Sequence, residues 1–436
     1  MRKAAALQRV LPGCVLIVIL WIGLSQVHIS TYQHNHKHPK LLQTINLQKS
    51  TVEKADNENN DHDEYESATK FKSDESPKDT ELSTLTVKIK GPDLKDKHDA
   101  LEKAVKCERY YGNVVIYVAI ATGALEQQYQ VAHATLKCYA QVHNYTLKVV
   151  DIFTDPLTQK YCAHWNIYFR KHCAVAAYLY EQRTSIDWLV VLDADTAVLN
   201  PAHCLEEYFD PTVNLVFYER FFNWEIASGN YIAKNSDFTR RFLQDWADYE
   251  YRQLTNFSGY DNGALQIHLL RTLMPRAVPE ANMCQAIWGE SKDYASYMRY
   301  VSCVRYALGG RKLWPPRVKF FRRGQGWVLD WQITGGLWCD AMFMLHSWKT
   351  NVVPNVTVGP GMWKDWPTPF SRLPQGDDCA AGNTNWPWRS EYRATCDRVK
   401  TQINESEYTH QLAFPADAKM LPYFLTSEIG YCWPDC

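Results

Sequence analysis

Trp188-Leu-Val-Val-Leu-Asp193-Ala-Asp195-Thr-Ala-Val-Leu-Asn200-Pro201 is the most informative stretch of the chain. The apolar run from Trp188 to Leu192 predicts a buried strand. Asp193 and Asp195 follow it, and residues two apart in an extended segment point the same way. Two converging carboxylates suit Mg²⁺ or Mn²⁺, which in turn can hold a diphosphate. The competing interpretation is a turn whose Asp residues are solvated or cap the backbone.

Strand and helix patterns alternate on both sides of this stretch. The predicted strands are Val114–Ile120, Leu147–Ile152, Asn214–Tyr218 and Ile226–Ala233, and the predicted helices are 125–141, Trp165–Arg183 and Ser236–Tyr251. This alternation predicts a Rossmann-like α/β domain with a largely parallel sheet. Ligands bind such sheets at the carboxyl ends of the strands, where Asp193 lies.

The N-terminal segment predicts entry into the secretory pathway. Arg2, Lys3 and Arg9 precede the apolar run 10–24, which predicts a signal-anchor with the rest of the chain translocated. The small-x-small pattern at 23–25 leaves a cleaved signal peptide as the alternative. Twelve of the thirteen cysteines follow this run, and so do the glycosylation sequons at 144, 256, 355 and 404. We therefore expect most of the twelve cysteines to form disulfides in an oxidising lumen.

The composition divides the chain into four parts. Residues 1–27 form the cytosolic tail and anchor, and residues 28–106, which are polar and lack Trp and Cys, predict a disordered stem. We expect residues 107–350, which carry the strand and helix patterns and the two carboxylates, to form the main folded domain. Residues 351–436, rich in Pro, Gly and Cys, predict a loop-dominated extension packed on that domain. The formal net charge of −1 gives no basis for a nucleic-acid partner.

Aromatic residues are the other compositional feature. Of sixteen Trp residues, all but one lie after residue 164. Trp327, Trp331, Trp338 and Trp348 cluster around a later candidate histidine, and we expect one or two of them to face an acceptor sugar and the rest to pack in the core.

Several blocks between Asn113 and Lys349 together resemble the GT-A glycosyltransferases. The blocks are Trp165 with Lys171, the Asp193-Ala-Asp195 core, Ala227-Ser-Gly229-Asn230, Tyr260-Asp261-Asn262-Gly-Ala-Leu and Phe343-Met-Leu-His346-Ser-Trp-Lys349. The resemblance is closest to the galactosyl- and mannosyltransferase group that includes plant xyloglucan xylosyltransferases. The chain is also similar to a nematode glycosyltransferase-like family with the same Asp-Ala-Asp core.

The resemblance implies a site and an activity. It implies Mn²⁺ or Mg²⁺ held by Asp193, Asp195 and His346, with Asp261 and Asn262 as catalytic residues. It also implies a nucleotide-sugar site made of Ala119, Thr122, Asp151, Lys171, Asp193, Gly229 and Lys349. Here Asn262 replaces the group's Gln, and Lys349 follows His346 by three residues, where the group has five or six.

The implied activity is that of a hexosyltransferase-like enzyme, a type II protein of the Golgi membrane. It would move a hexose or pentose from a UDP- or GDP-sugar to a glycan or glycoprotein acceptor, with retention of configuration. No general-base pair is needed if the acceptor attacks on the face that the phosphate leaves.

Two other functions remain open on the sequence. Asp193-Ala-Asp195-Thr196 fits the Asp-x-Asp-x-Thr motif of haloacid-dehalogenase phosphatases with Asp193 as nucleophile, and Asp377-Asp378 mimics their acidic metal motif. That motif normally follows the first strand of its domain, whereas two predicted strands precede it here. The second alternative is a non-catalytic lumenal carbohydrate-binding protein, against which the complete Asp193, Asp195 and His346 set argues.

Overall fold

The computed structural model describes residues 107–108, 110–123, 128–220, 223–252, 257–330, 334, 336–348 and 369–421. All of them belong to one compact unit that spans Ile89–Cys436. The predicted anchor (1–27) and stem (28–106) lie outside the described residues. Among the helices that are described, none is long and apolar enough to cross a membrane.

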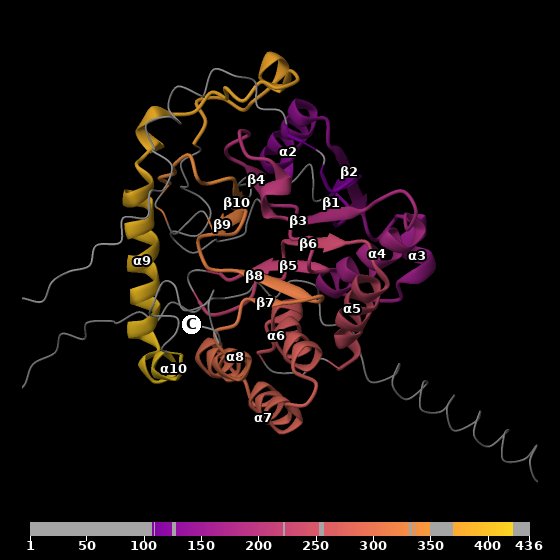
Figure 1. Cartoon of the computed structure of the whole chain (residues 1–436), viewed down its shortest axis with the longest axis vertical. Coiled ribbons are helices and arrows are strands. Elements are labelled where there is room, and N and C mark those ends of the chain that lie inside the picture. The colour runs from indigo at the N-terminus through magenta and orange to yellow at the C-terminus, as the bar shows by residue number, and fades with distance from the viewer. Residues whose placement is uncertain are drawn as a thin grey trace, which may run out of the picture. The chain divides into compact units, whose positions relative to one another are not determined.

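The main sheet has the strand order β2-β1-β3-β6-β5-β8-β7 (Figure 1). In that order the strands are Thr146–Asp151, Val114–Ile120, Trp188–Asp193, Tyr231–Lys234, Leu215–Tyr218, Val318–Phe321 and Leu313–Trp314. β1 is parallel to β2 and β3, and β5 is parallel to β8, whereas β6 is antiparallel to both of its neighbours. The predicted α/β class is confirmed, and the carboxyl ends of β1, β2 and β3 share one edge.

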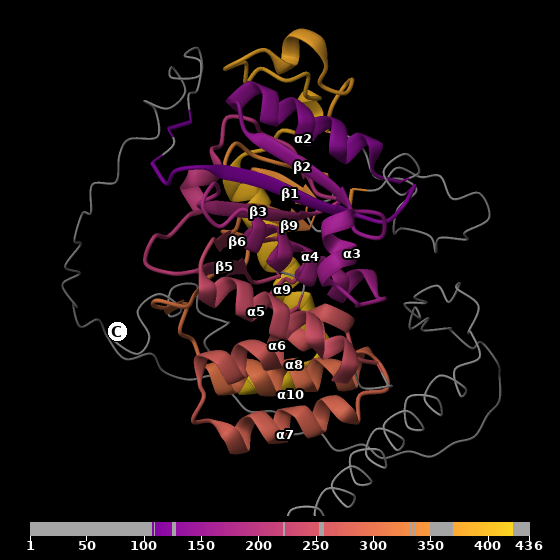
Figure 2. The ribbon, with the colours of Figure 1, turned by 90° about the vertical axis from the view of Figure 1, so that its right-hand side faces the viewer.

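Helices cover both faces of this sheet (Figure 2). α2 (Gln130–His143) lies over one face, and α4 (Ile167–Glu181), α5 (Asp237–Ala247) and α6 (Tyr260–Leu273) lie over the other. α3 (Pro156–Tyr161) precedes α4, and α7 (Val278–Gly289) and α8 (Tyr294–Leu308) follow α6.

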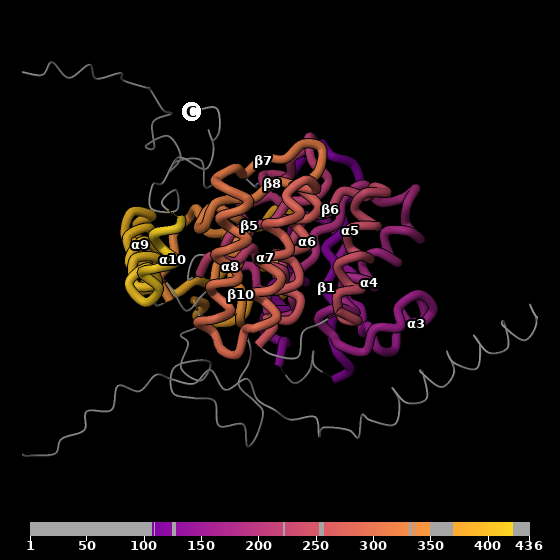
Figure 3. The backbone as a smooth tube through the Cα atoms, turned by 90° about the horizontal axis from the view of Figure 1, so that it is seen from below, coloured from indigo at the N-terminus to yellow at the C-terminus, as the bar shows by residue number. Residues whose placement is uncertain are grey.

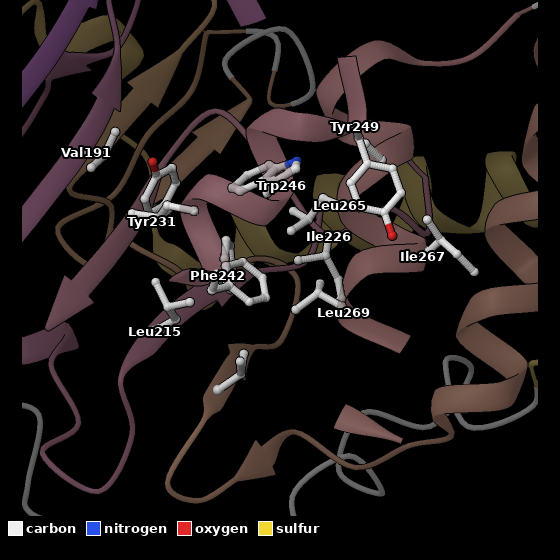
Figure 4. Packing of buried hydrophobic residues seen from close by; sticks show 14 of the residues in the cluster. Val191, Leu215, Ile226, Tyr231, Phe242, Trp246, Tyr249, Leu265, Ile267 and Leu269 are labelled. Carbon is white, nitrogen blue, oxygen red and sulfur yellow. The ribbon is translucent and has the colours of Figure 1, made fainter. Parts of the chain in front are cut away.

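The side chains of β1 alternate between two hydrophobic cores. Val115 and Tyr117 belong to the core shared with α4, α5 and α6, part of which is drawn in Figure 4. Ile116 and Val118 belong to the core shared with α2. Because both faces of β1 are buried, the strand is apolar throughout and not alternating, which is why its sequence is easily recognised.

A smaller sheet stands beside the carboxyl edge of β3. Its strand order is β4-β10-β9, with bounds Ala197–Val198, Met344–His346 and Val328–Asp330. β10 is antiparallel to β4 and parallel to β9. Since β4 begins two residues after Asp195, this pairing brings the end of β10 to the Asp-Ala-Asp turn.

The C-terminal region corrects one prediction. We expected loops, but Cys396–Ala413 form a long helix, α9, and Pro415–Met420 form α10. Both helices lie on one flank of the unit (Figure 3), and α10 follows at the C-terminal end of α9. Thr395 caps α9 by accepting the amide of Arg398. The helix was missed because its side chains are mostly polar and only Val399 and Glu407 are buried, so the sequence shows no strong apolar stripe.

Disulfides connect this region to the rest of the unit. Among the described residues, five pairs form: Cys107–Cys204, Cys138–Cys379, Cys162–Cys173, Cys284–Cys303 and Cys339–Cys396. Ten of the twelve cysteines after the N-terminal run are thus paired, which confirms that most of them form disulfides, and the other two, Cys432 and Cys436, lie outside the described residues.

Two predicted elements are shorter in the structure than the sequence pattern indicated. The predicted strand Ile226–Ala233 is a strand only from Tyr231. The amide of Ser228, before it, donates to the side-chain oxygen of Asn262 and not to a neighbouring strand. The predicted helix from Ser236 to Tyr251 ends at Ala247 and continues as a 3-10 turn over Asp248–Arg252.

Candidate metal centre

Asp193, Asp195 and His346 converge at the carboxyl end of β3. Nε2 of His346 lies 3.4 Å from Oδ2 of Asp193 and 3.3 Å from Oδ1 of Asp195. One ligand atom from each of the three residues fits within 4.8 Å of the others. The sequence expectation that these residues meet is therefore matched by the geometry. The register of the small sheet brings the three side chains together, because β10 ends at His346 beside the Asp-Ala-Asp turn.

The turn that carries the two carboxylates is fixed from its backbone. The side-chain oxygen of Asn230, which is fully buried, accepts the amide of Asp193 at 2.9 Å and the hydroxyl of Thr196 at 2.9 Å. The carbonyl of Asp195 accepts the amide of Trp348 at 2.8 Å. These hydrogen bonds orient Asp193 and Asp195 toward the centre before any ligand binds, which lowers the free-energy cost of forming a metal site.

Gly229, which the resemblance places in the nucleotide-sugar site, leaves room for the side chain of Asp193. A Cβ at this position would lie 1.9 Å from Oδ2 of Asp193. The space that a side chain would fill is thus occupied by the carboxylate of Asp193. Only glycine allows that carboxylate to reach the centre.

Asp330 is a member of the site that the sequence reasoning missed. It is paired in register with His346 across β9 and β10, and its Oδ1 lies 3.0 Å from Nδ1 of His346. A carboxylate on Nδ1 holds the ring in the tautomer that offers Nε2 to a metal. The signal was present, because Trp327-Val-Leu-Asp330 repeats the pattern of an apolar strand ending in Asp.

Lys171 and Asp261 meet behind Asp193. Nζ of Lys171 lies 2.9 Å from Oδ1 of Asp193 and 3.7 Å from Oδ2 of Asp261. Burial opposes the charge of Lys171, but the two carboxylates raise its pKa above the usual value, so it stays cationic. Oδ2 of Asp261 also lies 3.1 Å from Nε2 of His172, and burial lowers the pKa of that imidazole to about 4. His172 is therefore a neutral partner.

The remaining predicted residues lie around the same edge. Asn262 accepts the amide of Ser228 at 3.2 Å through its side-chain oxygen, so it braces the segment before β6. Ala119 is the register partner of Asp193. Thr122 donates to Asp151 at 2.7 Å at the ends of β1 and β2. Lys349 lies outside the described residues.

The tryptophans around His346 are mainly core residues. Trp327, Trp338 and Trp348 are buried, as expected for most of the four rings, and Trp331 lies outside the described residues, so a sugar-facing ring among them stays a prediction. A tryptophan-rich sequence around a site does not distinguish a binding surface from a core, because the same rings serve both.

Two arginines of this region are engaged in ion pairs. Arg220 lies 3.2 Å from Glu225, and buried Arg323 lies 3.1 Å from Glu407 of α9. Nearby, buried Glu219 pairs with Arg305 and Lys312.

The charges of the centre fit a divalent cation. Burial opposes protonation of His346, but Asp195 and Asp193 raise its pKa well above the usual value. Without a metal, a proton on His346 thus partly balances the three carboxylates around its ring, and a bound divalent cation would take over that role. Two carboxylate oxygens and one imidazole nitrogen are ligands that Mn²⁺ accepts readily, and Mg²⁺ accepts the oxygens.

Residues 136–360, just over half of the chain, match the family described as "Protein of unknown function, DUF273", and the chain belongs to this family. Among solved structures, the chain is similar to one titled "crystal structure of a glycosyltransferase involved in the glycosylation of the major capsid of PBCV-1". That similarity has a TM-score of 0.33 and 11% sequence identity, and it covers 54% of this chain and 93% of the other. No curated protein matches the chain.

Proposed function

We propose that this protein is a metal-dependent glycosyltransferase that moves a hexose or pentose from a nucleoside-diphosphate sugar to a glycan acceptor. The observation that supports this most strongly is the convergence of Asp193, Asp195 and His346 at the carboxyl edge of an α/β sheet. That edge is where such folds bind ligands. Asp330 behind His346 and Lys171 beside Asp193 add to the case, because a metal site needs such supporting contacts.

Each residue has a role in this proposal. Asp195 and His346 hold a divalent cation, Mn²⁺ or Mg²⁺, and Asp193 either shares it or accepts the donor ribose. When bound, the cation would neutralise the charge that develops on the leaving diphosphate.

The nucleoside lies along Ala119, Thr122 and Asp151 at the ends of β1 and β2, and Lys349 contacts the diphosphate. Asp261 and Asn262 lie on the sugar side of the site, where their packing positions Lys171 and the segment that holds Gly229.

The cellular setting is also a proposal. The basic residues before the apolar N-terminal run support a single-pass type II protein of the Golgi membrane with a lumenal catalytic unit. The disulfides agree with an oxidising compartment. A UDP- or GDP-sugar as donor and retention of configuration belong to the same proposal.

The phosphatase alternative receives no support from the geometry. Asp378, which would supply its acidic metal motif, binds Arg372 with both carboxylate oxygens and accepts the amide of Gln375 at 2.9 Å. Within the described residues, the group able to hold a metal consists of Asp193, Asp195 and His346, without Asp378.

A panel of nucleotide sugars with Mn²⁺, scored for release of nucleoside diphosphate, tests the proposal. Wild type should hydrolyse or transfer one donor, and Asp195→Asn and His346→Ala should reduce this by orders of magnitude while melting temperature changes little. Asp340→Asn is the matched control, since this exposed carboxylate pairs with Arg393 away from the centre. Metal-dependent donor binding without turnover would support the carbohydrate-binding alternative. Hydrolysis of p-nitrophenyl phosphate that needs Asp193 and not His346 would refute the proposal.

A further inference from the structure

Three large aromatic side chains are exposed beside the candidate metal centre. Trp165 is 71% exposed, Tyr168 42% and Tyr260 41%. The rings of Tyr168 and Tyr260 lie 5.1 Å apart, between the first turns of α4 and α6. We call Trp165, Tyr168 and Tyr260 the aromatic rim.

The rim is connected to the centre through two short segments. Tyr168 lies three residues before Lys171 on α4, and Tyr260 directly precedes Asp261 on α6. Lys171 in turn lies 2.9 Å from Asp193. A molecule resting on the rim would therefore lie about one helical turn from the residues that contact Asp193.

The backbone beneath the exposed rings is firmly held. The amides of Trp165 and Asn166 donate to Glu250 at 3.2 and 2.7 Å. The guanidinium of Arg170 donates to the carbonyl of His164 at 2.6 Å, and a disulfide joins Cys162 to Cys173. These rings are thus presented to solvent on a rigid support, which lowers the ordering cost of binding a ligand.

Tyr260 is held in an unfavourable backbone conformation. Its φ is 49°, in the left-handed region that bulky residues avoid. The ring remains substantially exposed, so burial does not compensate for the strain. Strain that packing does not explain is concentrated at functional sites. Asn or Gly would suit this backbone better than Tyr.

We propose that the aromatic rim is the acceptor subsite and that it stacks against a pyranose ring of the glycan acceptor. The inference rests on the proposed glycosyl transfer. The apolar face of a pyranose fits a flat aromatic surface. Tyr260 is on the α6 side, where Asn262 contacts Ser228 before β6, whereas Thr122 and Asp151 lie on the β1–β2 side of β3. The start of α4 contacts that second side, because Arg170 donates to the carbonyl of Ile152 at 2.7 Å, so the rim spans the space between the two sides. We assign the nucleobase to the ends of β1 and β2 and the acceptor to the rim.

Saturation-transfer NMR with methyl glycosides of galactose, glucose, mannose, xylose and N-acetylglucosamine tests this. At least one glycoside should show transfer to its ring C–H protons in wild type. The double variant with Trp165→Ala and Tyr168→Ala should weaken binding at least tenfold. Tyr306→Ala, which removes a 63% exposed ring on α8, should leave binding unchanged. Tyr260→Asn should also weaken binding while its melting temperature stays equal or rises, which a merely structural Tyr260 would not do.

Binding of UDP and GDP with Mn²⁺, measured on the same samples, separates the two proposals. Loss of nucleotide binding in the double variant, with glycoside binding intact, would show that the rim holds the base and overturn the inference. Absence of glycoside binding in wild type, or equal loss in the Tyr306 control, would also overturn it. If wild type binds glycosides but neither nucleotide, the proposed transferase function fails and the carbohydrate subsite stands.

Discussion

Replacing Gly229 by Ala tests whether the site depends on the close approach of the backbone just before β6 to the carboxylate of Asp193. The new methyl group would lie 1.9 Å from Oδ2 and 2.8 Å from Cγ of Asp193. An ordinary contact starts at 3.4 Å, so the carboxylate must move by roughly 1.5 Å. That movement would also break the 2.9 Å hydrogen bond from Nζ of Lys171 to Oδ1 of Asp193.

The size of this displacement sets the expected effect. Ligand distances in metal sites tolerate only about 0.2 Å of change, and a misplacement of about 1 Å can cost roughly 100-fold in rate. We therefore expect Gly229→Ala to weaken Mn²⁺ binding and to lower kcat/KM at least about 100-fold. The backbone at Gly229 does not have a positive φ, so the substitution adds no conformational strain of its own.

Mn²⁺ titration by electron paramagnetic resonance and donor hydrolysis provide the measurements. Gly376→Ala is the control for a general loss of stability, because its φ is 57° and nothing lies within 4 Å of the added carbon. It should cost about 1–2 kcal/mol of stability and leave the metal affinity unchanged. A Gly229→Ala protein with wild-type Mn²⁺ affinity and turnover would refute the claim that Asp193 occupies this space in the working enzyme.

Three further outcomes are expected. Asp330→Asn should weaken Mn²⁺ binding about 10- to 100-fold by loosening His346, with little change in melting temperature; an unchanged affinity would contradict the role of Asp330. Two buried cations hold the pKa of Glu219 at about 2, below its usual 4.5, although burial opposes this. Glu219 therefore stabilises the fold above pH 4.5, and about 3 kcal/mol of this is lost as the pH falls toward 2. In urea titrations Glu219→Gln should be less stable than wild type at neutral pH, and the gap should narrow across that window; a constant gap would refute this. Replacing Cys138 and Cys379 together by Ala should lower the free energy of unfolding by roughly 2–4 kcal/mol, because a separation of 241 residues is closed by this bond; equal stability in urea would count against it.

The sequence alone determined the features that depend only on residues close together in the chain. The apolar run into Asp193 and Asp195 predicted both the strand β3 and the place of the carboxylates, because a strand buried on both faces has no polar alternation to obscure it. The α/β class followed from the order of such runs. The even number of cysteines after the N-terminal run predicted pairing, although not which cysteines pair.

The tertiary structure decided the features that depend on register and on contacts between distant segments. His346 reaches Asp195 and gains Asp330 only through the pairing of β9 and β10. The role of Gly229 depends on the side chain of Asp193 at the end of β3, which no local pattern shows. Whether a tryptophan or tyrosine is buried or exposed depends on which elements cover it. Trp327 and Trp165 therefore look equally suited to a sugar in the sequence, and packing alone leaves only Trp165 at the surface.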